Sequence, residues 1–270
     1  MFWKSMQATF VRNFTSQIRA YPMSFFIGNL LTALYSVLSA WFMYQLLFKG
    51  QLNPSFQDLA GTSDYISYVI IGSAVYALSV RTCLNVSRSL ITELREGTLE
   101  SLMLTPFSRY GYFAGNMLQQ TVTSLAEVCL AFLICIPFGF QAGAFSLGGF
   151  LIALGASLYA FFGMSMVLGA VMLYTRDTYI SQNTLFVFMY LVSGVLFPSG
   201  YLPNALATVT RLIPLGPALD VVRASVFGIE SQSSFISTIT FLLVIGTLYT
   251  GVGFISMKHI ENIALEKIFG

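Results

Sequence analysis

The stretch LGGFLIALGASLYAFFGMSMVLGAVMLY, residues 147–174, is long, apolar and without a charged side chain. A helix needs about 20 apolar residues to cross the hydrocarbon core of a bilayer. The sequence therefore predicts an all-α, polytopic membrane protein with six transmembrane helices, arranged as a single domain over residues 1–270. The other five predicted spans lie near residues 22–48, 65–90, 112–138, 179–198 and 235–257.

The composition agrees with a protein that is mostly surrounded by lipid. Hydrophobic residues make up 56% of the chain, charged residues only 9%, and the mean hydropathy is +0.76. A soluble domain carries about 25% charged residues, because its surface faces water. The net charge of +2 is too small, and the basic residues are too scattered, for nucleic-acid binding. The partners expected from composition are therefore membrane lipids and not nucleic acid.

Lysine and arginine are distributed unequally between the two sides that six spans would define. Cytoplasmic segments carry an excess of these residues, so we expect both termini in the cytoplasm of a bacterial-type plasma membrane. The side that holds both termini carries Lys4, Arg12, Arg19, Arg88, Arg95, Arg109, Arg176, Lys258 and Lys267. The opposite side carries Lys49, Arg211 and Arg223.

Residues 1–20 show an amphipathic pattern and do not resemble a cleavable signal peptide. This pattern predicts an N-terminal helix that lies in the membrane interface. The alternative is a partly ordered segment that leads into the first span. On a helical wheel the apolar side holds Phe2, Trp3, Met6, Phe10, Phe14 and Ile18, and the other side holds Lys4, Arg12 and Arg19.

The segment between the fifth and sixth predicted spans, residues 199–234, is apolar but interrupted by Pro203, Pro214 and Pro217. Proline breaks a helix interior, so one straight spanning helix is excluded. The segment is also too apolar for a solvated loop. It predicts a re-entrant outer segment of short helices, because irregular backbone within a membrane must be sheltered by protein.

The chain lacks the groups that an enzyme of this size would need. His259 is the single histidine, and the three cysteines, Cys83, Cys129 and Cys135, form no CxxC pair. No Gly-Lys dipeptide occurs, so there is no Walker-type phosphate loop. We therefore expect no catalytic residue, no metal site and no cofactor bound by this chain.

Two ionisable residues, Arg81 and Glu127, fall inside predicted spans. A charged side chain at the centre of a spanning helix costs roughly 2.5–3.5 kcal/mol on insertion scales. One interpretation makes both residues part of a substrate route. The other has Arg81 reaching toward the headgroups, and Glu127 protonated or bonded to a neighbouring amide.

The predicted cytoplasmic loop after the second span carries a second amphipathic pattern. If residues 90–105 are helical, Glu93, Glu96 and Glu100 face one way, opposite a set of apolar residues. Gly97 is a poor helix former and Pro106 stops the helix. The pattern predicts a short helix that presents three carboxylates to the cytoplasm. A solvated loop helix without a particular role is the alternative.

The residues of this loop carry a family resemblance. Glu96-Gly97-Thr98-Leu99-Glu100, followed by Leu104-Thr105-Pro106 and Ser108-Arg109, resembles the cytoplasmic loop of type-2 ATP-binding-cassette (ABC) transporter permeases. The later run Ser193-Gly194, Phe197-Pro198, Leu202-Pro203 and Pro214-Leu215-Gly216-Pro217 resembles the segment after the fifth span in that family. With six spans in register, the resemblance covers essentially the whole chain.

The resemblance implies a role and partners. The loop helix would be a coupling helix, with Glu93, Glu96, Gly97 and Glu100 at the contact with a separate ABC ATPase, which would bind ATP and Mg²⁺. A second permease copy or paralogue would complete the substrate route. The chain would be the membrane subunit of an ATP-driven exporter of hydrophobic or amphipathic cargo, such as a drug, peptide, lipid or lipid-linked glycan.

The alternative function is a secondary transporter or channel that works without ATP. Such proteins place ionisable groups and broken helices in two matching halves. Here Arg81 and Glu127 are the intramembrane ionisable residues, and the two halves do not match.

Overall fold

The computed structural model describes residues 1–20, 22–51, 54–105, 108–135, 145–175, 184–228 and 232–269. Within these ranges every regular element is a helix and no strand occurs. The predicted all-α class is therefore confirmed.

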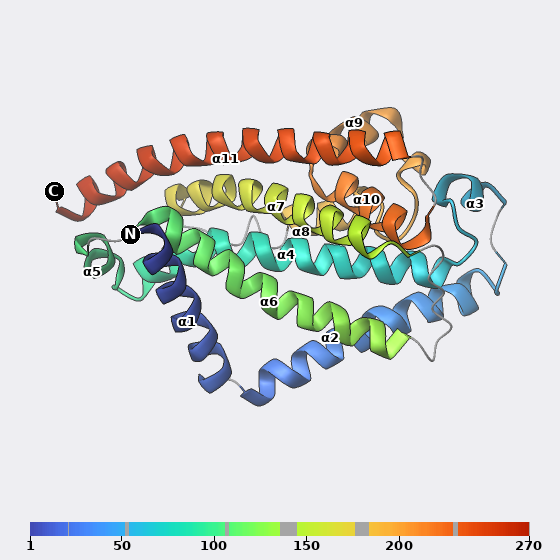
Figure 1. The fold of residues 1–270 in the computed structure, drawn as a ribbon, viewed down its shortest axis with the longest axis horizontal. Helices are drawn as coiled ribbons and strands as arrows, with labels where there is room; N and C mark the ends of the chain where they lie inside the picture. The colour runs from blue at the N-terminus through green and yellow to red at the C-terminus, as the bar shows by residue number, and fades with distance from the viewer. Residues whose placement is uncertain are drawn as a thin grey trace.

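Long helices form the body of the described chain, and Figure 1 shows α4, α7 and α11 running along its longest axis. α11 packs against α7, and α7 packs against α4, while α6 and α2 cross the bundle at a slant. The bounds of these helices are α2 Pro22–Phe42, continued by a π-helical segment Met43–Leu47, then α4 Tyr65–Arg95, α6 Arg109–Cys135, α7 Leu147–Thr175 and α11 Gln232–Phe269.

Three helical stretches of the described chain are long and apolar enough to cross a membrane. They are Ser55–Arg95, Leu147–Thr175 and Gln232–Ile260. This finding is consistent with a multi-pass membrane protein.

The remaining predicted spans correspond less completely. Spans 22–48 and 112–138 overlap α2 and α6. Span 179–198 contains the short helix α8 (Phe186–Val192), and its first residues lie outside the described ranges. The count of six spans therefore stays a prediction.

The two ends of the molecule have different contents. Figure 1 shows both termini and the short helix α5 (Leu99–Leu104) at one end, called here the α5 end. The short helices α3 (Pro54–Ala60), α9 (Asn204–Leu212) and α10 (Leu215–Phe227) lie at the opposite end, called here the α10 end. α4 connects the two ends.

Small residues set the distance between the long helices. A Cβ atom on Gly163 of α7 would lie 2.5 Å from the backbone oxygen of Gly246 on α11. A Cβ atom on Gly169 would lie 3.3 Å from Cα of Ser87 on α4. Helices in lipid associate through this kind of close backbone packing, since lipid tails are as apolar as the helices themselves.

The proline-containing segment forms two short helices at the α10 end. Pro203 and Pro214 directly precede α9 and α10, and Pro217 lies in the first turn of α10. α10 packs against α4, α7 and α11, and its Leu215 and Leu219 are fully buried. Proline is tolerated at helix starts because the first N–H groups have no partner within the helix. The relation of these helices to a membrane stays a prediction.

Candidate functional site

α4 ends in a hydrogen-bonded turn and does not continue into the next helix. Gly97 has φ +71°, its N–H donates to the Leu94 carbonyl at 3.3 Å, and the Thr98 N–H donates to the Glu93 carbonyl at 2.9 Å. These two bonds form a Schellman motif, in which glycine takes the left-handed position at low cost. α5 then begins at Leu99. The predicted single helix over residues 90–105 is therefore wrong, because Gly97 ends α4.

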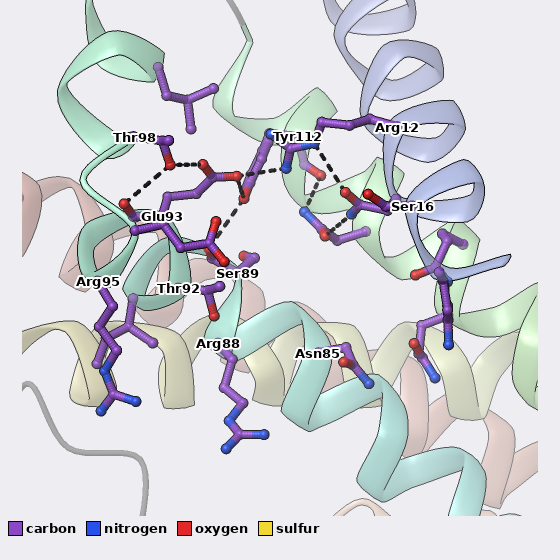
Figure 2. A pocket seen from close by; sticks show the side chains of 18 of the residues that line it. Arg12, Ser16, Asn85, Arg88, Ser89, Thr92, Glu93, Arg95, Thr98 and Tyr112 are labelled. Atoms are coloured by element: carbon purple, nitrogen blue, oxygen red, sulfur yellow. Dashed lines mark hydrogen bonds and ion pairs between the residues drawn. The ribbon is translucent and has the colours of Figure 1, made fainter. Parts of the chain in front are cut away.

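Glu93 is the centre of a hydrogen-bond network below this turn (Figure 2). Arg12 Nη2 of α1 donates to Glu93 Oε1 at 2.6 Å, forming an ion pair. The Tyr112 hydroxyl of α6 donates to the same oxygen at 3.1 Å, and the Thr98 hydroxyl donates to Glu93 Oε2. One carboxylate thus connects α1, α4, α6 and the turn before α5.

This network corrects the expected acidic face. Glu93 is only 6% exposed, whereas Glu96 is exposed at the turn. A buried carboxylate requires partners, and Arg12, Thr98 and Tyr112 supply them. Glu93 therefore does not share a solvent-facing surface with Glu96, and the side chain of Glu100 lies outside the described residues.

Arg12 is placed by the packing of α1 (Phe2–Ala20) on α6. A Cβ atom on Gly111 would lie 2.5 Å from the Phe2 carbonyl oxygen, and one on Gly115 would lie 2.6 Å from the Met6 carbonyl oxygen. The spacing of these two glycines is the GxxxG pattern, which allows close approach of two helices. The interfacial position predicted for residues 1–20 stays a prediction.

Further polar contacts hold α1 along α6. The Ser108 N–H donates to the Ser5 hydroxyl at 3.0 Å, and the Asn13 and Gln17 side chains bond to side chains of α6. The Arg12 side chain stays half exposed. Its partial burial alone would lower the pKa of Arg12, but the bond to Glu93 outweighs this effect and raises that pKa. The guanidinium is therefore charged at any physiological pH.

A cleft of about 980 Å³ opens beside this network at the α5 end. Its walls come from α1, α4, α5 and α6. Arg81, one of the two predicted intramembrane charges, lies half-buried on this wall. The side chain of Glu127, the other one, lies outside the described residues, so its relation to Arg81 stays a prediction.

The α10 end holds an arginine to which the sequence assigned no role. Arg223 of α10 is buried, and its guanidinium donates to the carbonyl oxygens of Gly194 at 2.9 Å, Tyr68 at 3.1 Å and Val195 at 3.1 Å. Its Cζ atom also lies 3.5 Å from the centre of the Tyr68 ring. Together these contacts join α10 to the start of α4 and to the segment after α8. The predicted outer-segment residues Pro203, Pro214 and Pro217 border this region in sequence and do not contribute to the Glu93 network.

The described polar residues mainly connect helices to one another. Within these ranges no group of three or more His, Cys, Asp and Glu side chains could hold a metal ion. Cys83 is buried between helices, and His259 is exposed on α11. The network at Glu93 can transmit a movement of the Gly97 turn to α1 and α6.

Comparison with known proteins adds one match. A family model described as ABC-2 type transporter matches residues 4–227. The matched range contains Arg12, the Glu93–Thr98 turn, the cleft and Arg223. No curated protein matches the sequence.

Proposed function

The chain belongs to the ABC-2 type transporter family, and we propose that it is the membrane subunit of an ATP-driven exporter, coupled through α5 to a separate ATPase. Members of this family are transporter permeases and not catalytic ATPases, and they work with ABC ATPase partners. In the proposed complex ATP and Mg²⁺ bind to the ATPase alone. The cargo is hydrophobic or amphipathic.

The Glu93 network is the observation that supports this proposal. A force applied to α5 reaches the Gly97 turn first, since that turn connects α5 to α4. Glu93 joins the turn to α1 through Arg12 and to α6 through Tyr112. Coupling between distant sites is carried by such hydrogen-bond networks and by rigid elements. A push on α5 would therefore move three helices together.

The ATPase contact that we propose consists of Glu96, Gly97 and Glu100, with Glu93 supporting it from below. Glu96 is exposed, and a Cβ atom on Gly97 would meet no atom within 4 Å. The turn is therefore accessible to a partner. Both termini lie at the same end as α5 (Figure 1), which supports the proposal that both termini are cytoplasmic in a complex with a cytoplasmic ATPase.

The proposed complex also contains a second permease copy or paralogue, which together with this chain encloses the substrate route. Many large apolar side chains are exposed on the described surface, among them Leu151, Leu248 and Ile255. Lipid or a second permease would cover such side chains in a plasma membrane.

Charge reversal tests the proposed contact. Glu96→Lys combined with Glu100→Lys should abolish co-purification of the proposed ABC ATPase partner, because like charges across a docking surface repel. Asp58→Lys, at an exposed carboxylate of the α10 end, is the matched control and should leave capture unchanged. Capture at full yield by a double variant that inserts normally would place the contact elsewhere.

A further inference from the structure

A line of arginines follows one face of α4. Arg81, Arg88 and Arg95 are spaced seven residues apart, and Asn85 and Thr92 lie between them. Seven residues are close to two helical turns, so the three arginines lie along one stripe at intervals of about 10 Å. All five side chains line the cleft at the α5 end. We call them the α4 stripe.

Two arginines of the α4 stripe lie apart from the Glu93 network in Figure 2. Arg88 and Arg95 extend from α4 on the same side of the helix, away from Glu93, Thr98 and Tyr112. Arg81 and Arg88 also interact within the protein. A ligand would therefore be attracted by the positive charge of the stripe and by its position along the cleft. Such attraction does not need a guanidinium that lacks a hydrogen-bond partner.

The charge of the cleft is positive after its internal ion pair is counted. The described lining residues include the arginines at 12, 81, 88 and 95 and the glutamates at 93 and 96. Arg12 and Glu93 neutralise each other at 2.6 Å. Glu96 offsets one of the three remaining arginines, which leaves a net charge of +2 on the described lining (four arginines less two glutamates). The stripe therefore retains a positive field over about 20 Å of helix length.

Apart from Arg12, the side chains of α1 and α6 that line the cleft are polar and uncharged. Asn13 and Gln17 of α1, and Asn116, Gln119 and Gln120 of α6, line the cleft across from α4. Guanidinium groups bind phosphate oxygens in a bidentate geometry, and amide groups add hydrogen bonds without competing charge. A cleft of about 980 Å³ accommodates a phosphate-bearing headgroup.

From this arrangement we infer that the cleft binds the anionic, phosphate-type headgroup of an amphipathic molecule, with the α4 stripe as its cationic track. Arg95 lies beyond the predicted span at residues 65–90, and Arg81 lies within it. The headgroup meets Arg95 and Arg88 first, and Arg81 draws it toward the membrane interior while the tail stays in lipid. The site is a property of the permease alone and does not depend on the proposed ATPase contact.

Direct binding to the full chain in a non-ionic detergent tests this inference. The probe is a water-soluble short-chain phosphatidic acid, compared with the phosphatidylcholine of equal chain length. We expect saturable binding of the anionic lipid and weaker binding of the zwitterionic one. Arg88→Gln with Arg95→Gln should weaken the anionic lipid about tenfold or more, because charge-assisted hydrogen bonds are lost.

Matched variants keep the outcome interpretable. Arg211→Gln removes an exposed arginine at the α10 end and should leave the affinity unchanged. Arg95→Gln alone removes an exposed side chain, so it should fold normally and still weaken binding if the double variant fails to fold.

Inorganic phosphate and pyrophosphate distinguish the two sources of this chemistry. Weak competition by these ions assigns the site to a lipid headgroup, because the tail then contributes affinity. Competition as strong as that of the short-chain lipid assigns it to a free phosphate species. Equal binding of both lipids, or wild-type affinity in the Arg88 and Arg95 variants, would overturn the inference.

Discussion

Arg12 and Arg223 bind to opposite ends of the same helix in two different ways. Arg12 pairs with Glu93 at the last turn of α4, stays half exposed and borders a cleft of about 980 Å³. Arg223 is buried against the first turns of α4, bonds to three backbone carbonyls and borders a pocket of about 180 Å³. The first contact joins a half-exposed arginine to a buried carboxylate, and the second joins a buried arginine to backbone carbonyls.

Because of this difference we expect the two ends to differ in rigidity. Arg12 is half exposed, so water can solvate it when the pair opens during a transport cycle, while Glu93 keeps its bonds from Tyr112 and Thr98. Buried carbonyl groups that lose a charged donor cost more than this opening. We therefore expect the α10 end to move as one unit and the α5 end to adjust.

Removal of Arg223 should have the largest effect. Arg223→Ala removes the charged donor from the carbonyls of Gly194, Tyr68 and Val195, and a hydrogen bond to a charged group contributes roughly 1.5–3 kcal/mol. The free energy of unfolding in mixed micelles should fall by about 3 kcal/mol or more by this measure. Arg223→Lys, which keeps the charge but not the planar fork, should recover only part of the loss. Near wild-type stability of the alanine variant would remove the distinction between the two ends.

Alanine in place of Gly72 or Gly97 should lower the free energy of unfolding by an intermediate amount. The cause differs between the two positions. A Cβ atom at Gly72 would lie 2.5 Å from Arg223 Nη2 and 2.6 Å from the Val195 carbonyl oxygen. Gly72→Ala should cost about 1–3 kcal/mol by overpacking. At Gly97 the surroundings are open, and Gly97→Ala should cost about 1–2 kcal/mol from its left-handed backbone alone.

A second substitution separates these causes. Asparagine tolerates the left-handed region, so Gly97→Asn should recover stability relative to Gly97→Ala. Gly72→Asn should be worse than Gly72→Ala, because its larger side chain meets the same atoms. If the asparagine and alanine variants had equal stability at both positions, overpacking at Gly72 and backbone strain at Gly97 would not be the causes.

The smallest effect on stability should come from Arg12→Gln. Arg12 is half exposed, glutamine can still donate to the buried Glu93, and Glu93 keeps Tyr112 and Thr98, so the free energy of unfolding should fall by about 1 kcal/mol. If the Glu93 network couples α5 to α1, the same variant should also lower the amount of cargo transported per ATP hydrolysed. We expect this loss even under conditions where the variant stays folded. A loss of stability as large as that of Arg223→Ala would show that the two arginines are equivalent.

Patterns in the sequence predicted the helical class, the positions of the long helices and a break in the outer segment. These features depend on local hydropathy and on proline, which act within a few residues. Pro203 and Pro214 mark helix starts in the structure as their missing N–H groups require.

The site depended on contacts that no local pattern contains. Glu93 was assigned to a solvent face from helical spacing, but its partner Arg12 lies 81 positions away in the sequence. Gly97 was recognised as a poor helix former, yet its role as the end of α4 follows from the hydrogen bonds to Glu93 and Leu94. Gly111 and Gly115 form a GxxxG pattern in the sequence, which is the local signal for the docking of α1 on α6.

The docking of α1 on α6 also sets an order of events during synthesis. Ser5 and Ser108 meet across 103 residues, so α1 leaves the ribosome well before its groove at Gly111 and Gly115 exists. At about 5–20 residues per second, the N-terminal helix waits roughly 5–20 seconds for its partner. During that interval its apolar side, with Phe2 and Trp3, has to be covered by the bilayer surface or by a chaperone. α1 therefore reaches its final place only after α6 (Arg109–Cys135) has been made, while α7, α10 and α11 are still to follow.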